Sequence, residues 1–234
     1  MFLSKLDSLS NARKLISDNQ KTTEIEEISI HDAHKRVLAE DIIAFHDSPP
    51  FDKSAMDGFA LIAENTFGAS NSAPKELKII DAIGAGDFPS KKVNENEAIV
   101  IATGAPIPEG ANAVLMKEYI TTDGDDLTIY SQVTPGENVS PKSEDIEKGQ
   151  KILDKNTFIR YQELGLIASA GYDKVKVYKK PKVKLIITGN ELVEPTKEDI
   201  DKAKIINSNQ FTIKAMVEDS GAICDIGRAG DTFD

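Results

Sequence analysis

The sequence of 234 residues lacks tryptophan and contains only one cysteine and three histidines. One cysteine excludes an internal disulfide and cannot form a thiolate metal cage by itself. Cys224 lies in the apolar segment AICDIG, which favours packing in a buried strand over reactivity. His31 and His34 stand three residues apart beside Asp32, a spacing that could bind a metal on a helix. Without a third ligand, a solvated helix surface is the favoured interpretation.

Long apolar runs and positive charge are also scarce. No segment approaches the roughly 18 apolar residues that a membrane-spanning helix needs, and MFLSKLDSLSNARKL is too polar for a signal peptide. The net charge of −11 opposes binding to nucleic acid or to an anionic membrane. We therefore expect a cytoplasmic protein without nucleic-acid or membrane partners. The basic run KVKVYKKPKVK alternates with valines, which favours a strand with one solvated lysine face over an anion-binding patch.

Residues 1–46 are predicted to form the first half of a helical stem. Apolar residues recur at helical spacing in LSKLDSLSNARKLISD, and Ser29 opens a capping box at the start of SIHDAHKRVLAED. Residues 144–180 contain another helix signal, FIRYQELGLIASAG, with Thr157 as a candidate N-cap and Gly171 just past the C-terminal end. We interpret these stretches as two halves of one stem.

Residues 47–143, between the two halves, have the pattern of a β-rich domain. Gly, Pro, Asn and Asp separate four short apolar runs: ELKIIDAI, EAIVIATG, NAVLMKEYI and DLTIYSQV. The prolines of SPPFDKS cannot continue a helix and mark the start of this region. The sequence therefore predicts a β-rich domain inserted into a helical stem that is split in sequence.

Residues 181–234 change pattern again. The order VKLIITG, NQFTIKAMVEDSG, AICDIG is that of a strand, a helix and a second apolar strand, which predicts a βαβ unit of a parallel sheet. Parallel sheets need several strands and helices on both faces. We therefore expect the start of an α/β domain that is cut short, in a chain whose fold class is multidomain α+β.

Two loops of the β-rich region contain candidate functional residues. In SAMDGFA, Asp57 either closes its own turn while Gly58 takes a positive φ, or serves a site. In ATGAPIPEGANAV, the prolines either stiffen a hairpin connection or hold Thr103 and its neighbouring N–H groups ready for an anionic or polar ligand. Spacing does not choose between these alternatives.

Two further candidates lie in the α/β region. Glu191 in IITGNEL follows a predicted parallel strand, at the end where open α/β sheets place their ligands, although a solvated loop acid remains the alternative. Asn207 begins NSNQ, which caps the next helix, and a helix N-terminus offers free N–H groups to phosphate or another oxyanion. The Gly-x-Gly of IGAGDF lacks a βαβ context, so a nucleotide site there is weakly indicated.

The segments PPFDKSAMDGFAL, ATGAPIPEGANAVLMKE, PGENVSPKSEDI, KVKLIITGNELVEP and IINSNQFTIKAMVEDSGA together resemble the molybdopterin molybdenumtransferase (MoeA) family, which is related to the gephyrin E domain. The resemblance covers essentially the whole chain. It implies a split helical stem, an inserted β-rich domain, a MogA-like three-layer α/β domain and a C-terminal β-barrel. By this resemblance the α/β domain is partial and the barrel is absent. The family also implies a homodimer, with molybdopterin adenylyltransferase and molybdoenzyme maturation proteins as partners.

The activity implied by the resemblance is molybdenum insertion: adenylylated molybdopterin is hydrolysed while molybdenum from molybdate is placed on the dithiolene, with Mg²⁺ as the expected ion. The chain by itself is then expected to be an inactive fragment. Mapped onto this sequence, the family's residues are, for catalysis, Asp57, Thr103, Asp145 and Glu191; for cofactor binding, Ser54, Gly104, Lys142 and Asn207; and for metal binding, Glu191 and Asp231.

The sequence departs from the family pattern at three places. SPKS leaves Lys142 as the cation where relatives often carry an arginine-rich run, and Asn190 and Asn207 replace two aspartates that could bind a metal. Two other functions fit parts of the pattern. One is a non-enzymatic scaffold or assembly protein of the same architecture. The other is a molybdopterin adenylyltransferase, which resembles the α/β region but lacks the SAMDGFA and TGAPIPEG loops.

Overall fold

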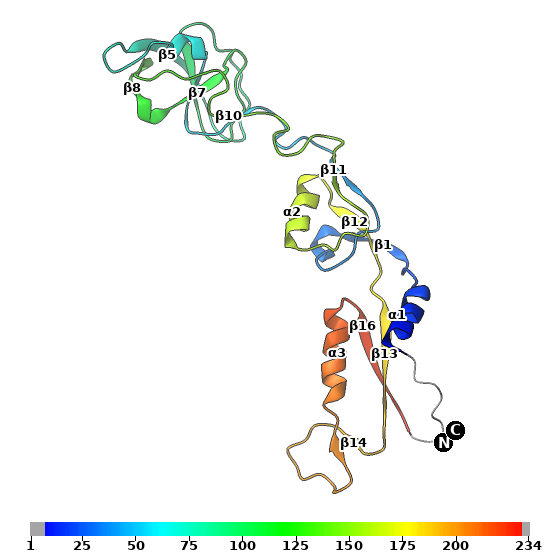
Figure 1. Ribbon diagram of the computed structural model, residues 1–234. Coiled ribbons are helices and arrows are strands. Elements are labelled where there is room, and N and C mark those ends of the chain that lie inside the picture. Colours follow the sequence, from blue (N-terminus) through cyan, green and yellow to red (C-terminus); the bar gives the residue numbers. More distant parts are fainter. Residues whose placement is uncertain (1–7, 231–234) are drawn as a thin grey trace. The chain divides into compact units, whose positions relative to one another are not determined.

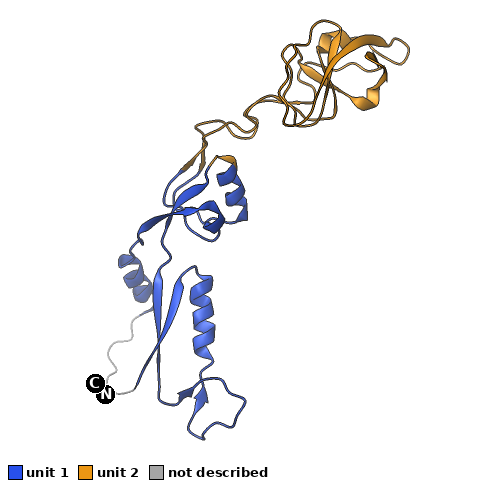
Figure 2. Cartoon of the chain, turned by 180° about the vertical axis from the view of Figure 1, so that it is seen from behind, with its two compact units in different colours: residues 1–41, 153–168, 172–234 blue, residues 42–152, 169–171 orange. Residues whose placement is uncertain are grey.

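The computed structural model describes residues 8–230, which divide into two compact units (Figures 1 and 2). Unit 1 combines the described residues up to 41 with residues 153–168 and the described residues from 172 onward. Unit 2 comprises residues 42–152 and residues 169–171. None of the described helices is long and apolar enough to cross a membrane.

A six-stranded sheet organises unit 2. Only the β5–β6 pair is parallel, and the other neighbours run antiparallel. The four apolar runs predicted as strands are confirmed. In spatial order the strands are β7 (Ala113–Met116), β4 (Gly58–Leu61), β6 (Glu97–Ile101), β5 (Lys75–Ile83), β9 (Asp126–Ile129) and β8 (Ile120–Asp123). Two short 3₁₀ turns, η2 (Ala63–Thr66) and η3 (Lys117–Tyr119), lie between strands of this sheet. Outside it, β3 (Lys53–Ser54) pairs antiparallel with β10 (Val139–Ser140).

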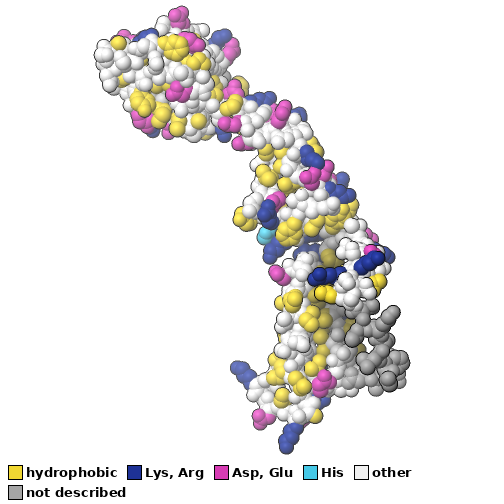
Figure 3. Space-filling view, in the orientation of Figure 1, with side chains coloured by type: hydrophobic (Ala, Val, Ile, Leu, Met, Phe, Trp, Pro, Cys, Tyr) yellow, Lys and Arg dark blue, Asp and Glu magenta, His cyan; other side chains and the backbone are white. Residues whose placement is uncertain are grey.

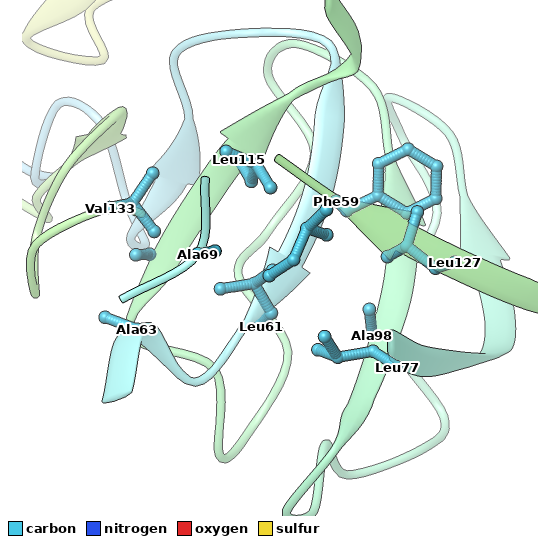
Figure 4. Close-up of a cluster of buried hydrophobic side chains, with 11 residues drawn as sticks. Phe59, Leu61, Ala63, Ala69, Leu77, Ala98, Leu115, Leu127 and Val133 are labelled. Carbon is cyan, nitrogen blue, oxygen red and sulfur yellow. The ribbon is translucent and has the colours of Figure 1, made fainter. Parts of the chain in front are cut away.

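The central strands of this sheet are buried on both faces, which explains their continuous apolar sequences. Successive side chains of a strand point to opposite faces. In β4, Phe59 and Leu61 accordingly join one buried cluster and Ala60 joins another. β7 alternates in the same way, because Leu115 packs with Phe59 whereas Val114 packs on the opposite face. Figure 4 shows the first cluster.

In unit 1, the two sequence-distant parts meet through backbone hydrogen bonds. Strand β1 (Ile25–Ser29) pairs antiparallel with β12 (Lys174–Tyr178). In β12 the valines are buried and Lys174 and Lys176 are exposed, so the predicted solvated lysine face is confirmed for this strand. The N-terminal part also contains helix α1 (Leu9–Asp18) and the short turn η1 (Ile30–Asp32). The second part contains helix α2 (Tyr161–Ser169), which precedes β12.

The predicted helix in SIHDAHKRVLAED is wrong. The Ser29 hydroxyl accepts a hydrogen bond from the His31 N–H, as a cap would, but only the 3₁₀ turn η1 follows. Lys35 takes φ 61°, and its N–H donates to Ile159 O, while Leu38 N–H donates to Thr157 O. Tertiary pairing with the 156–159 segment thus replaces the intrahelical hydrogen bonds. The helix predicted in LSKLDSLSNARKLISD is confirmed as α1, so within residues 8–46 the first half of the expected stem keeps one of its two predicted helices.

For helix α2, the predicted N-cap Thr157 is wrong, whereas the predicted position of Gly171 just past the C-terminal end is confirmed. Thr157 is not its N-cap, because the Thr157 hydroxyl donates to Asp154 O and the helix begins at Tyr161. Gly171, with φ 97°, lies just past the C-terminal end, and Tyr172 N–H donates back to Ile167 O. This bond satisfies a carbonyl that the helix leaves without an internal partner.

The predicted βαβ unit is confirmed. Strand β13 (Lys182–Thr188) runs parallel to β16 (Ile223–Ala229), and α3 (Asn209–Asp219) packs against both strands (Figure 1). A second parallel pair joins β14 (Leu192–Val193) and β15 (Ile205–Ile206). Figure 3 shows hydrophobic side chains at the surface over α3. Exposed apolar side chains are expected here, because this α/β layer contains few elements that could cover them. Cys224, predicted to be buried, is free and only partly buried.

Replacing Phe59 by alanine is expected to lower the free energy of unfolding by about 3–5 kcal/mol, because the change leaves a cavity in a packed cluster. Phe67→Ala is a matched control in the same unit, since the Phe67 side chain is 46% exposed and Phe59 only 6%. Urea unfolding followed by circular dichroism measures both. Equal losses in the two variants would contradict the assignment of Phe59 to the core.

Candidate functional site

At one edge of the unit 2 sheet, formed by the ends of its strands, β4 begins and its two neighbours β6 and β7 end. In the strand register, Gly58 at the start of β4 pairs with Ile101 at the end of β6 and with Met116 at the end of β7. Asp57 directly precedes β4, Lys117 directly follows β7, and Thr103 lies two residues beyond β6. The register therefore brings these three side chains together from distant parts of the sequence.

Hydrogen bonds from Thr103 hold the Asp57 carboxylate. Its Oδ1 accepts from both the backbone N–H and the hydroxyl of Thr103, each at 2.8 Å. Its Oδ2 lies 3.7 Å from Lys117 Nζ. The Thr103 backbone N–H, then the Thr103 hydroxyl and, more weakly, Lys117 lower the pKa of Asp57 below its ordinary value. Asp57 is thus an ionised, oriented carboxylate that is still exposed to solvent.

The self-closing turn proposed as the alternative for SAMDGFA is not what forms. Asp57 bonds a residue 46 positions away, and Gly58 does not have a positive φ. Glycine is required at position 58 for another reason, since an added Cβ would lie 2.1 Å from Leu115 O. The absent side chain allows β4 to approach β7 closely.

The TGAP loop is bonded along the SAMDGFA segment. Gly104 N–H donates to Ser54 O and Ser54 N–H donates to Ala105 O, at 2.8 and 2.9 Å. Gly104 has φ 85°, and the space where a Cβ would lie is open. The Ser54 side chain is buried, and its hydroxyl donates to Met56 O at 2.5 Å. The predicted binding residue Ser54 thus braces its own loop, whereas Gly104 borders open space beside Thr103.

Lys142 and Asp145 lie in a loop that is bonded to the SPPFD segment. Lys142 N–H donates to Asp52 Oδ1 at 2.7 Å, and Lys142 Nζ lies 3.0 Å from Asp47 Oδ2. A hydrogen bond from the Lys148 backbone N–H, followed by Lys142, lowers the pKa of Asp47 to about 2. Asp145 N–H donates to Ser48 O, and residue 145 is exposed. The charge of Lys142 is therefore engaged with a neighbouring carboxylate.

Glu191 lies in unit 1, just after β13. Its carboxylate folds over Gly189, where an added Cβ would lie 2.6 Å from Glu191 Oε1. A hollow of about 270 Å³ opens at the same end of β13 and is lined by Gly189, Asn190 and Arg228, among others. As predicted from the strand order, Glu191 follows the carboxyl end of a parallel strand.

Asn207 caps the start of α3. Its Oδ1 accepts from Gln210 N–H at 3.2 Å, and its own N–H donates to Val193 O. The side chain is 3% exposed, and within the described part of the chain its Nδ2 has no hydrogen-bond partner. Buried polar groups normally have partners, so this amide is a candidate ligand contact. The capping role predicted for NSNQ is confirmed at this residue.

The predicted site residues thus fall into two groups. Asp57, Thr103, Ser54, Gly104, Lys142 and Asp145 belong to unit 2, whereas Glu191 and Asn207 belong to unit 1. Asp231 lies outside the described residues. Within residues 8–230, no three or more His, Cys, Asp or Glu side chains gather in a way that could hold a metal ion. Sequence reasoning missed Lys117, whose only signal was its place directly after an apolar run.

Asp47→Asn is expected to destabilise the protein at neutral pH and to weaken its pH dependence below about pH 4. The folded pKa of Asp47, about 2, lies below the ordinary 3.8. Its stabilising contribution is therefore complete above the ordinary value and is lost as the pH falls through the folded value. Thermal melts from about pH 7 to about pH 2 should bring the two proteins together at the acid end. A difference that stays constant over this range would contradict the assignment. Asp123→Asn, in an exposed strand of the same unit, serves as the control.

Residues 7–171 match the family profile described as "MoeA N-terminal region (domain I and II)". The chain is 38% identical over 213 residues to a molybdopterin molybdenumtransferase of Staphylococcus aureus strain MRSA252, which covers 91% of this chain and 51% of that protein. It is 40% identical over 194 residues to one of Staphylococcus epidermidis strain RP62A, covering 83% and 46%.

A solved structure shows the same fold. The crystal structure of the molybdopterin biosynthesis moeA protein from Pyrococcus horikoshii OT3 matches with a TM-score of 0.89 and 37% identity, covering 97% of this chain and 61% of that one. The chain spans about half the length of the curated relatives it matches. Since the profile covers most of the sequence and relatives at 38% and 40% identity align along most of it, the chain belongs to the MoeA family of molybdopterin molybdenumtransferases.

Proposed function

We propose that this chain contributes the N-terminal half of a molybdenum insertase. The reaction is the hydrolysis of adenylylated molybdopterin with transfer of molybdenum from molybdate to the dithiolene. The names of the relatives support molybdenum transfer to molybdopterin, and the alignment to about half of their length supports the assignment to one half. We further propose that the isolated chain is inactive, because the remaining half of the relatives has no counterpart in it.

The Asp57–Thr103 pair is the observation that carries this proposal. Hydrolysis of a phosphoanhydride needs an oriented nucleophile and stabilisation of the charge that develops on the phosphoryl oxygens. Asp57 is held ionised by two donors from Thr103, at an exposed sheet edge where a ligand can reach it. We assign the orienting role to Asp57, with Thr103 as its positioning residue. Glu191, after β13, is the second acid of the proposal.

Magnesium does not fit the described residues alone. Mg²⁺ is usually held by one or two carboxylates together with substrate phosphates and waters. Asp57 Oδ1 already accepts two hydrogen bonds, and Glu191 is a single carboxylate, so side chains of the described residues alone do not complete a site. Within residues 8–230, neither carboxylate belongs to a group of three or more His, Cys, Asp or Glu side chains that could hold a metal ion. The proposal therefore assigns no step to the ion. The partners proposed for the reaction are a molybdopterin adenylyltransferase, as the source of the substrate, and molybdoenzyme maturation proteins, as acceptors of the product.

In a protein that carries this chain and extends to the full length of its relatives, Asp57→Asn and Glu191→Gln are each expected to abolish molybdenum insertion. Both changes keep size and remove charge. Because both side chains are exposed, the melting temperature should change little. The assay is formation of active cofactor from adenylylated molybdopterin and molybdate, beside a thermal melt. Asp126→Asn, an exposed carboxylate paired with Lys78, is the control. Wild-type activity in both variants would refute the assigned roles.

We also propose a homodimer, in which α1 supplies part of the contact. Leu9, Leu15 and Ile16 are each more than half exposed, and α1 buries none of its residues within this chain. Unpartnered apolar side chains on a helix favour association. Leu9→Glu combined with Ile16→Glu should therefore dissociate the dimer, whereas Lys14→Glu should not. Sedimentation equilibrium measures this, and a concentration-independent wild-type monomer would contradict the proposal.

A further inference from the structure

Lys117 occupies a defined place at the edge of the unit 2 sheet. It directly follows β7, and the pairing of Gly58 with Met116 sets it beside Asp57. Its Nζ lies 3.7 Å from Asp57 Oδ2, beyond the distance of an ordinary hydrogen bond. The ammonium group therefore keeps donors available for a ligand.

Two other lysines of this unit, Lys78 and Lys92, are bonded more directly to carboxylates. Lys78 Nζ lies 2.5 Å from Asp126, and Lys92 Nζ lies 2.7 Å from Glu109. Lys117 differs from both in distance and in its surroundings. Its carboxylate partner is Asp57, whose other oxygen is already held by two hydrogen bonds from Thr103. This arrangement orients Asp57 toward the lysine while leaving the lysine side chain 62% exposed.

The space beside this lysine can admit a ligand. Gly104 follows Thr103 with φ 85°, and no atom lies within 4 Å of the place where its Cβ would be. The Thr103 and Asp57 side chains are also exposed at this edge. An ammonium group at an open position binds the oxygens of phosphate-like anions as a point charge with several donors. The neighbouring carboxylate restricts the ammonium group to this edge of the sheet.

We propose that Lys117 binds an oxyanion of the substrate at this edge, with Asp57 as the residue that positions it. The oxyanion is either the phosphoryl group of the adenylylated substrate or molybdate, which share tetrahedral oxygens and negative charge. This assignment rests on the proposed function and adds a cation to a site otherwise described by its acids. It also places anion binding at a residue outside the SPKS loop, where Lys142 is paired with Asp47.

The test measures the Michaelis constants for adenylylated molybdopterin and for molybdate separately, in the protein extended to the length of its relatives. Lys117→Gln should raise one of them by about tenfold while kcat changes by less than about twofold, as expected for lost ground-state binding of an anion. Lys117→Arg should restore most of the binding. Lys92→Gln, in an exposed ion pair of the same unit, is the matched control. The constant that rises identifies which anion binds. If neither rises, or if the arginine variant is as weak as the glutamine variant, the proposal is overturned.

A binding measurement separates this proposal from the proposed reaction. Inorganic phosphate and molybdate are titrated separately into this chain while the Thr103 amide and Lys117 side-chain resonances are followed by NMR. At least one anion should shift both resonances in the wild type and have a much smaller effect in Lys117→Gln. This outcome supports the site even if the extended protein inserts no molybdenum. Absence of shifts with both anions overturns it, even if insertion is observed.

Discussion

The close approach of β4 to β7 at Gly58 is the constraint on which the site in unit 2 depends. A side chain at position 58 would collide with Leu115 O, so only glycine permits this pairing. The same register buries Phe59 and Leu61 on one face of the sheet. A slip of one residue would turn both side chains to the opposite face, so core packing and site assembly require the same alignment.

Around Asp57, hydrogen-bond donors and a lysine offset the negative charge that prevails over the chain as a whole. The net charge of −11 disfavours anions in general, yet the proposed substrates are anions. Near Asp57 this difficulty is reduced, because Thr103 donates two hydrogen bonds to one carboxylate oxygen and Lys117 lies beside the other. The lysine expected from sequence to serve this purpose, Lys142, is instead paired with Asp47.

The candidate residues of unit 1 have a different physical character from those of unit 2. Asn207 is buried and its amide nitrogen lacks a partner among the described residues, whereas Glu191 is exposed and folds over a glycine. Both lie next to the parallel β-strands of the βαβ segment, where the fold class places ligands.

The sequence by itself determined four strands of the inserted sheet (β5, β6, β7 and β9), the βαβ segment and the family, but it predicted a loop where the central strand β4 begins. Apolar periodicity and glycine or proline boundaries are local properties, and the loop motifs are contiguous. It did not determine the conformation after Ser29, because hydrogen bonds to residues 156–159 outcompeted a local capping signal. Only the tertiary structure decided that Asp57 bonds Thr103 and lies beside Lys117. These contacts follow from strand register, which joins residues far apart in the chain and leaves no local pattern to detect.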